Sequence, residues 1–147
     1  MNTPILKPRR SACPINLMLE ILGDAWSLLI VRDMMFFGAT RFSELKGARE
    51  KIATNILADR LQKLENAEII WKRRDPSDAR KFIYGLTEKG ADLAPILAEV
   101  VLWSYQYEDT DIPLDVVNAI KADRAAFVTQ TKARLIQAGS SGSNNPR

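Results

Sequence analysis

The side chains best suited to binding chemistry in this sequence lie in the middle third of the chain. Residues 72–81 (KRRDPSDARK) hold five basic groups and two acidic groups. A cluster of this kind releases counterions from a polyanion and gives a salt-dependent affinity. A charged run is also typical of a solvated loop, so the preceding segment must decide between the two alternatives.

The preceding segment, residues 53–66, predicts an amphipathic helix with a polar outer face. Its apolar positions are Leu57, Leu61 and Leu64, at spacings of four and three residues. The opposite face and its flank carry Thr54, Asn55, Ala58, Asp59, Gln62 and Asn66. Asn and Thr suit adenine and thymine edges, whereas Asp59 would repel phosphate. Asp59 could instead accept from a cytosine amino group or pair with Lys63 at i+4.

Composition narrows the class of protein. The chain has 147 residues, about one domain, and a net charge of +3 with pI near 9.1. Residues 41–90 carry twelve basic and eight acidic groups, while residues 91–147 carry five basic and seven acidic groups. No apolar run approaches the roughly 20 residues of a membrane span, and the N-terminus lacks the apolar core of a secretory signal. We expect a soluble cytoplasmic protein that binds no membrane.

Enzymatic and metal chemistry find little support in the sequence. Histidine is absent, and the single cysteine excludes an intrachain disulfide or a multi-cysteine zinc site. There is no glycine-rich phosphate loop, and no spacing of Ser and Lys singles out a catalytic dyad. We therefore expect no catalytic residues, no cofactor and no metal.

The order of predicted elements sets the fold class. Helices are expected from Pro14 to Gly23, from an Asp24 N-cap to near Gly38, over 43–48 and over 53–66, with a possible short strand at 39–42. Strands are expected at 69–74 and 80–86, on either side of a turn. Thr87 is expected to cap a helix that runs to about Tyr107, and Pro95 marks either a kink in this helix or its true start. Another helix is expected over 114–137. Arg32 and Asp33 are placed toward the polar side of their helix. This order predicts a mainly α fold with a small β wing, a winged helix-turn-helix with flanking dimerisation helices.

Several separated motifs carry a family resemblance. They are Cys13-Pro14, LEILGDAWSLLIVRDM (19–34), RFSEL (41–45), LADRLQKLENAEII (57–70), YGLTEKG (84–90) and Trp103. In this order they resemble the HxlR family of bacterial transcriptional regulators, from Cys13 to about Trp103. The wing sequence DPSDARKFIYGLTEKG (75–90) also looks like the broader MarR group. The chain departs from the family at Ala53, where Ser or Thr usually opens the helix. Loss of this cap lowers stability by about 1 kcal/mol unless Thr54 takes its place. The Pro-Ser-Asp-Ala wing tip is a second departure.

The resemblance implies a homodimer on a pseudo-palindromic operator in double-stranded DNA, with 53–66 as recognition helix and 69–86 as wing. The domains expected are a flexible basic arm (1–12), the winged helix-turn-helix (13–107), a C-terminal dimerisation helix (108–138) and a disordered tail (139–147). The dimer helices are expected at 88–107 and 114–137, together with the N-terminal segment. Occlusion of a promoter would make the protein a repressor. The alternative is a winged-helix protein-interaction module without specific DNA binding.

The expected DNA contacts fall into three groups. Base-edge contacts from the recognition helix are assigned to Thr54, Asn55, Ala58, Asp59 and Lys63. Wing contacts are assigned to Arg74, Ser77, Arg80 and Lys81, with Arg80 either entering a minor groove or bridging to Asp75 or Asp78. Backbone contacts are assigned to Arg41, Ser43, Lys46 and Lys51.

Other residues receive mainly structural roles. Arg60 is expected to tie helices together through a carboxylate. Trp26, Phe42, Trp71 and Trp103 are expected to pack, with an effector pocket near the dimer helices as the alternative.

Cys13 has two interpretations. A lone cysteine is often a buried, inert hydrophobe. Some members of the resembled family use an N-terminal cysteine next to proline to sense oxidants or electrophiles. The basic arm and the N-terminus of the following helix would lower the pKa of the Cys13 thiol. The switch would then be a disulfide across the dimer or a mixed adduct.

Overall fold

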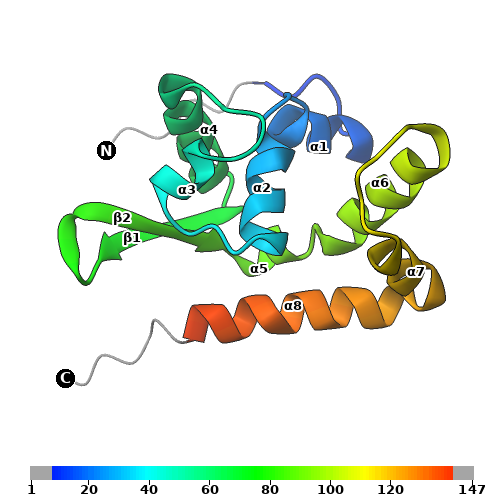
Figure 1. The fold of residues 1–147 in the computed structure, drawn as a ribbon. Helices are drawn as coiled ribbons and strands as arrows, with labels where there is room; N and C mark the ends of the chain where they lie inside the picture. Colours follow the sequence, from blue (N-terminus) through cyan, green and yellow to red (C-terminus); the bar gives the residue numbers. More distant parts are fainter. Residues whose placement is uncertain (1–7, 141–147) are drawn as a thin grey trace.

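A computed structural model describes residues 8–140 of the chain. Four helices come first: α1 (Pro14–Leu22), α2 (Ser27–Phe36), α3 (Phe42–Lys46) and α4 (Thr54–Asn66). Strands β1 (Ile70–Asp75) and β2 (Asp78–Leu86) form the wing, which projects from the helical body in Figure 1. Helices α5 (Glu88–Ala91), α6 (Ala94–Tyr107), α7 (Leu114–Ala122) and α8 (Arg124–Ser140) follow. The predicted winged helix-turn-helix is confirmed.

The junction between α1 and α2 is held by Asp24, as predicted. Its carboxylate accepts hydrogen bonds from the N–H groups of Trp26 (2.8 Å) and Ser27 (2.9 Å), which would otherwise be unpaired at the start of α2. Helix α2 ends at Phe36, two residues before Gly38, which adopts a left-handed φ of 67° suited to glycine. The placement of Asp33 on a polar face is wrong, because Asp33 is buried beside Arg32.

The wing is an antiparallel pair in which Ile70 lies opposite Leu86 and Arg74 opposite Phe82. The short strand considered at 39–42 is reduced to one bridge between Arg41 and Ile83, beside a 2.8 Å hydrogen bond from Tyr84 N–H to the Thr40 carbonyl. The Trp71 ring covers Gly85, where a Cβ atom would lie 2.2 Å from the ring. The middle of β2 therefore joins the segment that leads into α3.

Two long helices expected in the second half are each broken. Thr87 caps α5 by accepting from Gly90 N–H (3.1 Å), but α5 ends at Ala91, and Pro95 occupies the first turn of α6. The helix expected over 114–137 breaks at the extended residue Asp123, whose carboxylate accepts from Ala126 N–H (3.0 Å) in the first turn of α8. Helix α8 continues to Ser140, so residues 139 and 140 are helical and do not belong to the predicted tail. The rest of that prediction, residues 141–147, lies outside the described residues.

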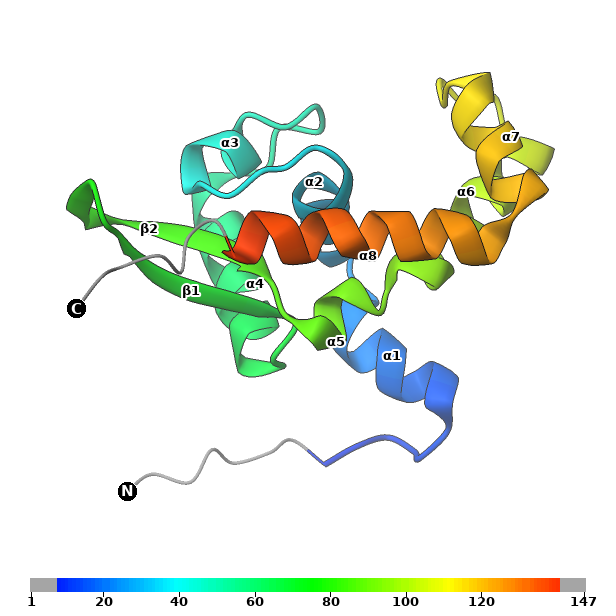
Figure 2. The same ribbon diagram turned by 90° about the horizontal axis from the view of Figure 1, so that it is seen from below.

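Helix α8 runs back beneath the body of the protein toward the wing (Figures 1 and 2). The centres of the Phe127 and Phe36 rings lie 6.3 Å apart, which joins α8 to α2, and Val128 and Leu135 pack against the core. Ion pairs from Arg124 to Glu99 and from Lys132 to Asp92 lie along α6 and its start. Much of the apolar side of α8, which the sequence assigned to dimerisation, therefore packs on its own chain.

At the N-terminus, residues 8–12 are exposed, and the N–H of Arg10 donates to the Glu20 carboxylate (2.9 Å). The rest of the predicted basic arm, residues 1–7, lies outside the described residues. Across the described part of the chain, we find no individual helix with the length and apolarity to cross a membrane. Helices α1 and α2 would satisfy that test only together, and they are bent by 82° relative to each other.

Candidate nucleic-acid interface

Helix α4 turns its leucines inward and its small polar residues outward. Leu57 is fully buried, and Leu61 and Leu64 are 3% and 1% exposed. Thr54, Asn55, Ala58 and Asp59 are exposed along the other side, and we call these four residues the α4 ridge. The N-cap residue Ala53 makes no side-chain cap hydrogen bond, so the loss of the usual Ser or Thr is not compensated there. The ridge lies on the surface, as the leucine spacing predicts.

The acidic residue of the ridge is paired. Lys63 Nζ lies 3.2 Å from Asp59 Oδ2, and the Arg60 guanidinium also donates to this carboxylate. The Lys63 hydrogen bond is the main cause that lowers the pKa of Asp59. The predicted i+4 pair is confirmed, and the negative charge that would repel phosphate is partly balanced.

Arg60 also fixes the position of α4. Its Nε donates to Asp24 Oδ1 at 3.0 Å, which links α4 to the start of α2 and confirms the predicted structural role. Burial raises the pKa of Asp24, but hydrogen bonds from Ser27, Trp26 and Arg60 outweigh it and lower the pKa to about 2. One ionised carboxylate thus caps α2 and holds α4.

Three cations of the wing lie against aromatic rings, two against Phe82 and one against Trp71. Lys72 Nζ lies 4.1 Å from the centre of the Phe82 ring, and the Arg74 guanidinium lies 5.0 Å from it. Arg74 also donates to the Ala79 carbonyl (2.5 Å). On the other face, Arg73 stacks 4.6 Å from the Trp71 ring. These contacts hold positive charge along both faces of a narrow hairpin.

Arg80 is the most exposed of the paired cations, with 89% of its side chain accessible. Its Nε lies 3.1 Å from Asp78 Oδ1, so the predicted alternative of a turn-shaping bridge is present in the structure. Lys81 is exposed beside it. The bridge fixes the direction of Arg80 without burying its guanidinium.

Arg41 and Ser77, both predicted DNA contacts, meet at Asp75. The Asp75 carboxylate is buried and accepts from the Arg41 guanidinium, from Ser77 N–H (2.8 Å) and from Ser77 Oγ (2.7 Å). The Arg41 bond is the first cause that holds the pKa of Asp75 well below its usual range. The sequence predicted no central role for Asp75, although Asp followed two residues later by Ser is a signal for this local turn.

The other predicted backbone contacts lie on the α3 side of the molecule. Ser43 and Lys46 are exposed on α3, and Lys51 is exposed in the turn before α4, with a left-handed φ of 54°. The structure therefore leaves all three side chains accessible.

Cys13 is exposed at the N-cap position of α1. The N–H groups of Asn16 and then Ile15 hydrogen-bond the sulfur and lower the pKa of the thiol. The expectation that Cys13 is buried is therefore wrong for the single chain.

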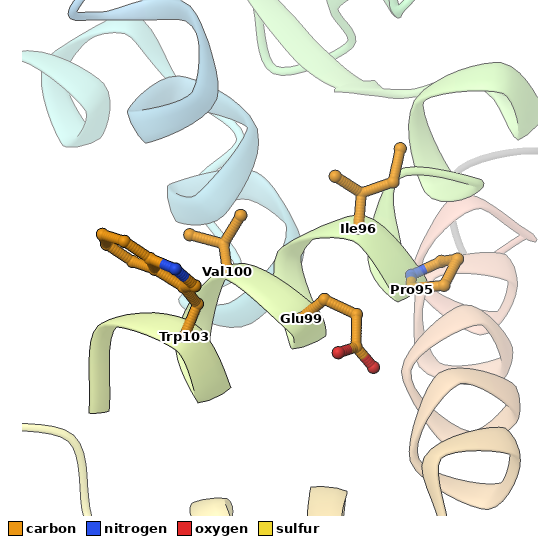
Figure 3. A pocket seen from close by; sticks show the side chains of 5 residues that line it. All are labelled: Pro95, Ile96, Glu99, Val100 and Trp103. Atoms are coloured by element: carbon orange, nitrogen blue, oxygen red, sulfur yellow. The ribbon is translucent and has the colours of Figure 1, made fainter. Parts of the chain in front are cut away.

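The packing role predicted for the four aromatics holds for three of them. Trp26, Phe42 and Trp71 are partly buried, but Trp103 is 62% exposed and lies 5.5 Å from the Tyr107 ring. Ile96, Val100 and Trp103 project from one side of α6 in Figure 3, whereas Glu99 points away. We call Ile96, Val100 and Trp103 the α6 stripe; with Pro95 and Glu99 they line an open hollow.

A winged helix-turn-helix with an exposed polar recognition helix and a basic hairpin defines a class of DNA-binding transcriptional regulators. The family described as "HxlR-like helix-turn-helix" matches residues 21–112, and this chain belongs to that family. The family consists of transcriptional regulators rather than enzymes, which agrees with the sequence analysis at that level.

Individual relatives agree with the family. The transcriptional regulator YodB of Bacillus subtilis is 36% identical over 60% of this chain and 78% of its own. Its reduced form has a TM-score of 0.55 and is 32% identical, over 66% of this chain and 95% of that chain. The oxidised redox regulator HypR has a TM-score of 0.56 and is 28% identical, over 67% of this chain and 100% of that chain. The structure of PA1607 has a TM-score of 0.63 and is 35% identical, over 71% and 72% of the two chains. The family match ends before α7, so α7 and α8 extend beyond it.

Proposed function

We propose that this protein is a homodimeric repressor that binds a pseudo-palindromic operator and releases it when Cys13 is modified by oxidants or electrophiles. The observation that carries the proposal is the α4 ridge, which is exposed on a helix whose leucines are buried, beside a hairpin rich in fixed cations. Its dimensions and chemistry suit the major groove.

In this arrangement the two elements have different tasks. Asn55 pairs with an adenine edge, Ala58 approaches a thymine methyl group, and Thr54, Asp59 and Lys63 complete the base-edge and nearby contacts. Arg80 enters the adjacent minor groove. Phosphates are contacted by a set of flanking side chains: Arg74, Ser77, Lys81, Arg41, Ser43, Lys46 and Lys51.

Dimerisation is assigned to α1 and α6. Ile15 and Leu19 of α1 are more than half exposed, and the α6 stripe adds a second uncovered apolar surface. Because α8 packs largely on its own chain, it contributes less to the dimer than the sequence suggested. A two-fold dimer would place the two α4 helices at half-sites about one helical turn, 10–10.5 base pairs, or a multiple apart.

The proposed response to oxidants rests on the exposure of Cys13 and the helix N-terminus that favours its thiolate. Structures of YodB in reduced, diamide-treated and quinone-bound forms show that a relative has been captured with such reagents. With one cysteine per chain, oxidation would join two thiols across the dimer or form a mixed adduct with a small thiol or electrophile.

The test is a mobility shift with the DNA upstream of the protein's own gene, with random DNA of equal length as competitor. The regulator proposal expects a specific complex that an oxidant such as diamide dissociates, and that Cys13→Ser makes resistant to the oxidant. A specific complex that ignores diamide would reject the Cys13 switch alone. Equal binding to both DNAs by a stable dimer would support the protein-interaction alternative.

A further inference from the structure

A buried carboxylate inside the most basic segment of the chain is an unexpected feature. Asp75 is 4% exposed, although Arg73, Arg74 and Arg80 lie within five residues of it in the sequence. Its oxygens are occupied by the Arg41 guanidinium and by both the N–H and the hydroxyl of Ser77. A group buried with three donors is part of the architecture of the hairpin, and its charge is not presented to a ligand.

The two ends of this contact belong to different parts of the molecule. Asp75 ends β1, at the irregularity in the strand register between Arg74 and Asp75. Arg41 precedes α3, and its N–H donates to the Glu44 carboxylate in that helix (3.1 Å). Residues 34 apart in the sequence are thereby joined, and the far end of the wing is tied to the helix-turn-helix body.

We propose that Arg41, Asp75 and Ser77 form a wing clamp, whose task is to set the direction of the wing relative to α4. The inference rests on the proposed DNA-binding function, and it makes Arg41 and Asp75 positioning residues. The clamp places Arg74 and Arg80 where the DNA backbone passes once α4 is in the major groove. This role replaces a direct phosphate contact as the main contribution of Arg41.

The clamp can be separated from simple electrostatics because the two predict opposite signs. Asp75→Asn removes a negative charge from the wing, so charge alone predicts tighter DNA binding. The clamp predicts weaker binding, because an amide loses the charged partner of Arg41 and the hairpin is free to reorient. Glu68→Gln is the control for charge, since it removes one negative charge from an exposed carboxylate shortly before β1 that takes no part in the Arg41–Asp75–Ser77 contact.

The experiment measures operator affinity by fluorescence anisotropy for the full chain and for Asp75→Asn, Glu68→Gln, Arg80→Ala and the Asp75→Asn/Arg80→Ala double variant. We expect Asp75→Asn to bind about tenfold more weakly and Glu68→Gln to bind as tightly as the wild type or more tightly. In the Arg80→Ala background, Asp75→Asn should cost much less, because the side chain that it positions is already absent. Thermal unfolding of each variant reports whether the fold is retained.

Arg41→Gln tests the same contact from the body side, should Asp75→Asn fail to fold. We expect Arg41→Gln to weaken binding, and to weaken it much less in the Arg80→Ala background. A direct phosphate contact of Arg41 would instead cost the same factor in both backgrounds. The clamp is contradicted if folded Asp75→Asn binds as well as the wild type or better, or if its loss is unchanged in the Arg80→Ala background. A wild-type chain without preference for operator DNA would contradict the proposed function itself.

Discussion

Helix α4 and the wing differ in whether their exposed polar side chains are hydrogen-bonded within the protein. Within the described residues, Thr54 and Asn55 on the α4 ridge make no side-chain hydrogen bonds, and the leucines beneath them are buried. In the wing, by contrast, Arg80 bonds Asp78 and Arg74 bonds the Ala79 carbonyl. The helix leaves donors and acceptors exposed and unbonded, whereas the hairpin holds its charge in fixed positions.

This difference agrees with the roles that we propose for the two surfaces. A base edge is distinguished by its pattern of donors and acceptors, so unpaired amides and hydroxyls on a rigid helix are useful. Phosphates offer the same charge at every step, so a cation needs only a defined place. An internal bond such as that of Arg80 to Asp78 fixes that place.

The largest expected effect comes from removing the support of the ridge. Leu57→Ala leaves a cavity beneath α4 and should lower the free energy of unfolding by about 2–5 kcal/mol. Denaturant unfolding checks this value. Thr54→Ala, at an exposed position of the same helix, is the control and should change stability by less than about 0.5 kcal/mol. Equal effects at the two positions would show that α4 is not packed as described.

Asn55→Ala should change the choice of base without altering the fold. We expect a loss of about 1–3 kcal/mol of discrimination at one base pair per half-site. Binding to a set of single-base operator variants measures this directly. Unaltered selectivity would mean that the helix enters the groove by another face.

The link between α4 and α2 should depend on pH. Because the folded-state pKa of Asp24 is about 2, below its ordinary value of 3.8, its contribution to stability is present above about pH 4. That contribution, on the order of 2 kcal/mol, should be lost as the pH falls from about 4 toward 2. Unfolding measured over this range should be steeper for the wild type than for Asp24→Asn. Parallel pH profiles would exclude this role for Asp24.

The smallest expected effect is that of the wing cation. Arg80→Ala should weaken binding to all DNA sequences alike and reduce the slope of log affinity against log salt by up to about one. Titrations at several salt concentrations, on operator and random DNA, give both quantities. If the slope stays the same, Arg80 is not a backbone or minor-groove contact.

The sequence predicted the parts of the fold that depend on local periodicity. The leucines at 57, 61 and 64 fixed the inner face of α4, and the Asp24 and Thr87 caps were found from residue type alone. The break at Asp123 was missed, because apolar positions continue through it. The break at 92–93 agrees with one of the two predicted meanings of Pro95, the true start of a helix, since α6 begins at Ala94.

The details of the site depended on contacts that the sequence cannot show. Asp75 meets Arg41 across 34 residues, so neither residue type nor spacing indicates the pair. Trp103 was assigned to packing by its type, yet its single-chain environment leaves it exposed. Asp33 was placed outside by its charge, whereas its pair with Arg32 permits burial.

Footprinting of the wild-type protein on its upstream DNA tests the central claim most directly. The account predicts two major-groove segments protected from base modification, centred one helical turn or a multiple apart, with protected minor-groove backbone beside each. The Arg80→Ala variant should lose the minor-groove protection and keep the two major-groove segments. Two outcomes would contradict the proposal that α4 contacts the bases and the wing contacts the backbone. One is protected segments without this spacing, and the other is equal protection of the major and minor grooves.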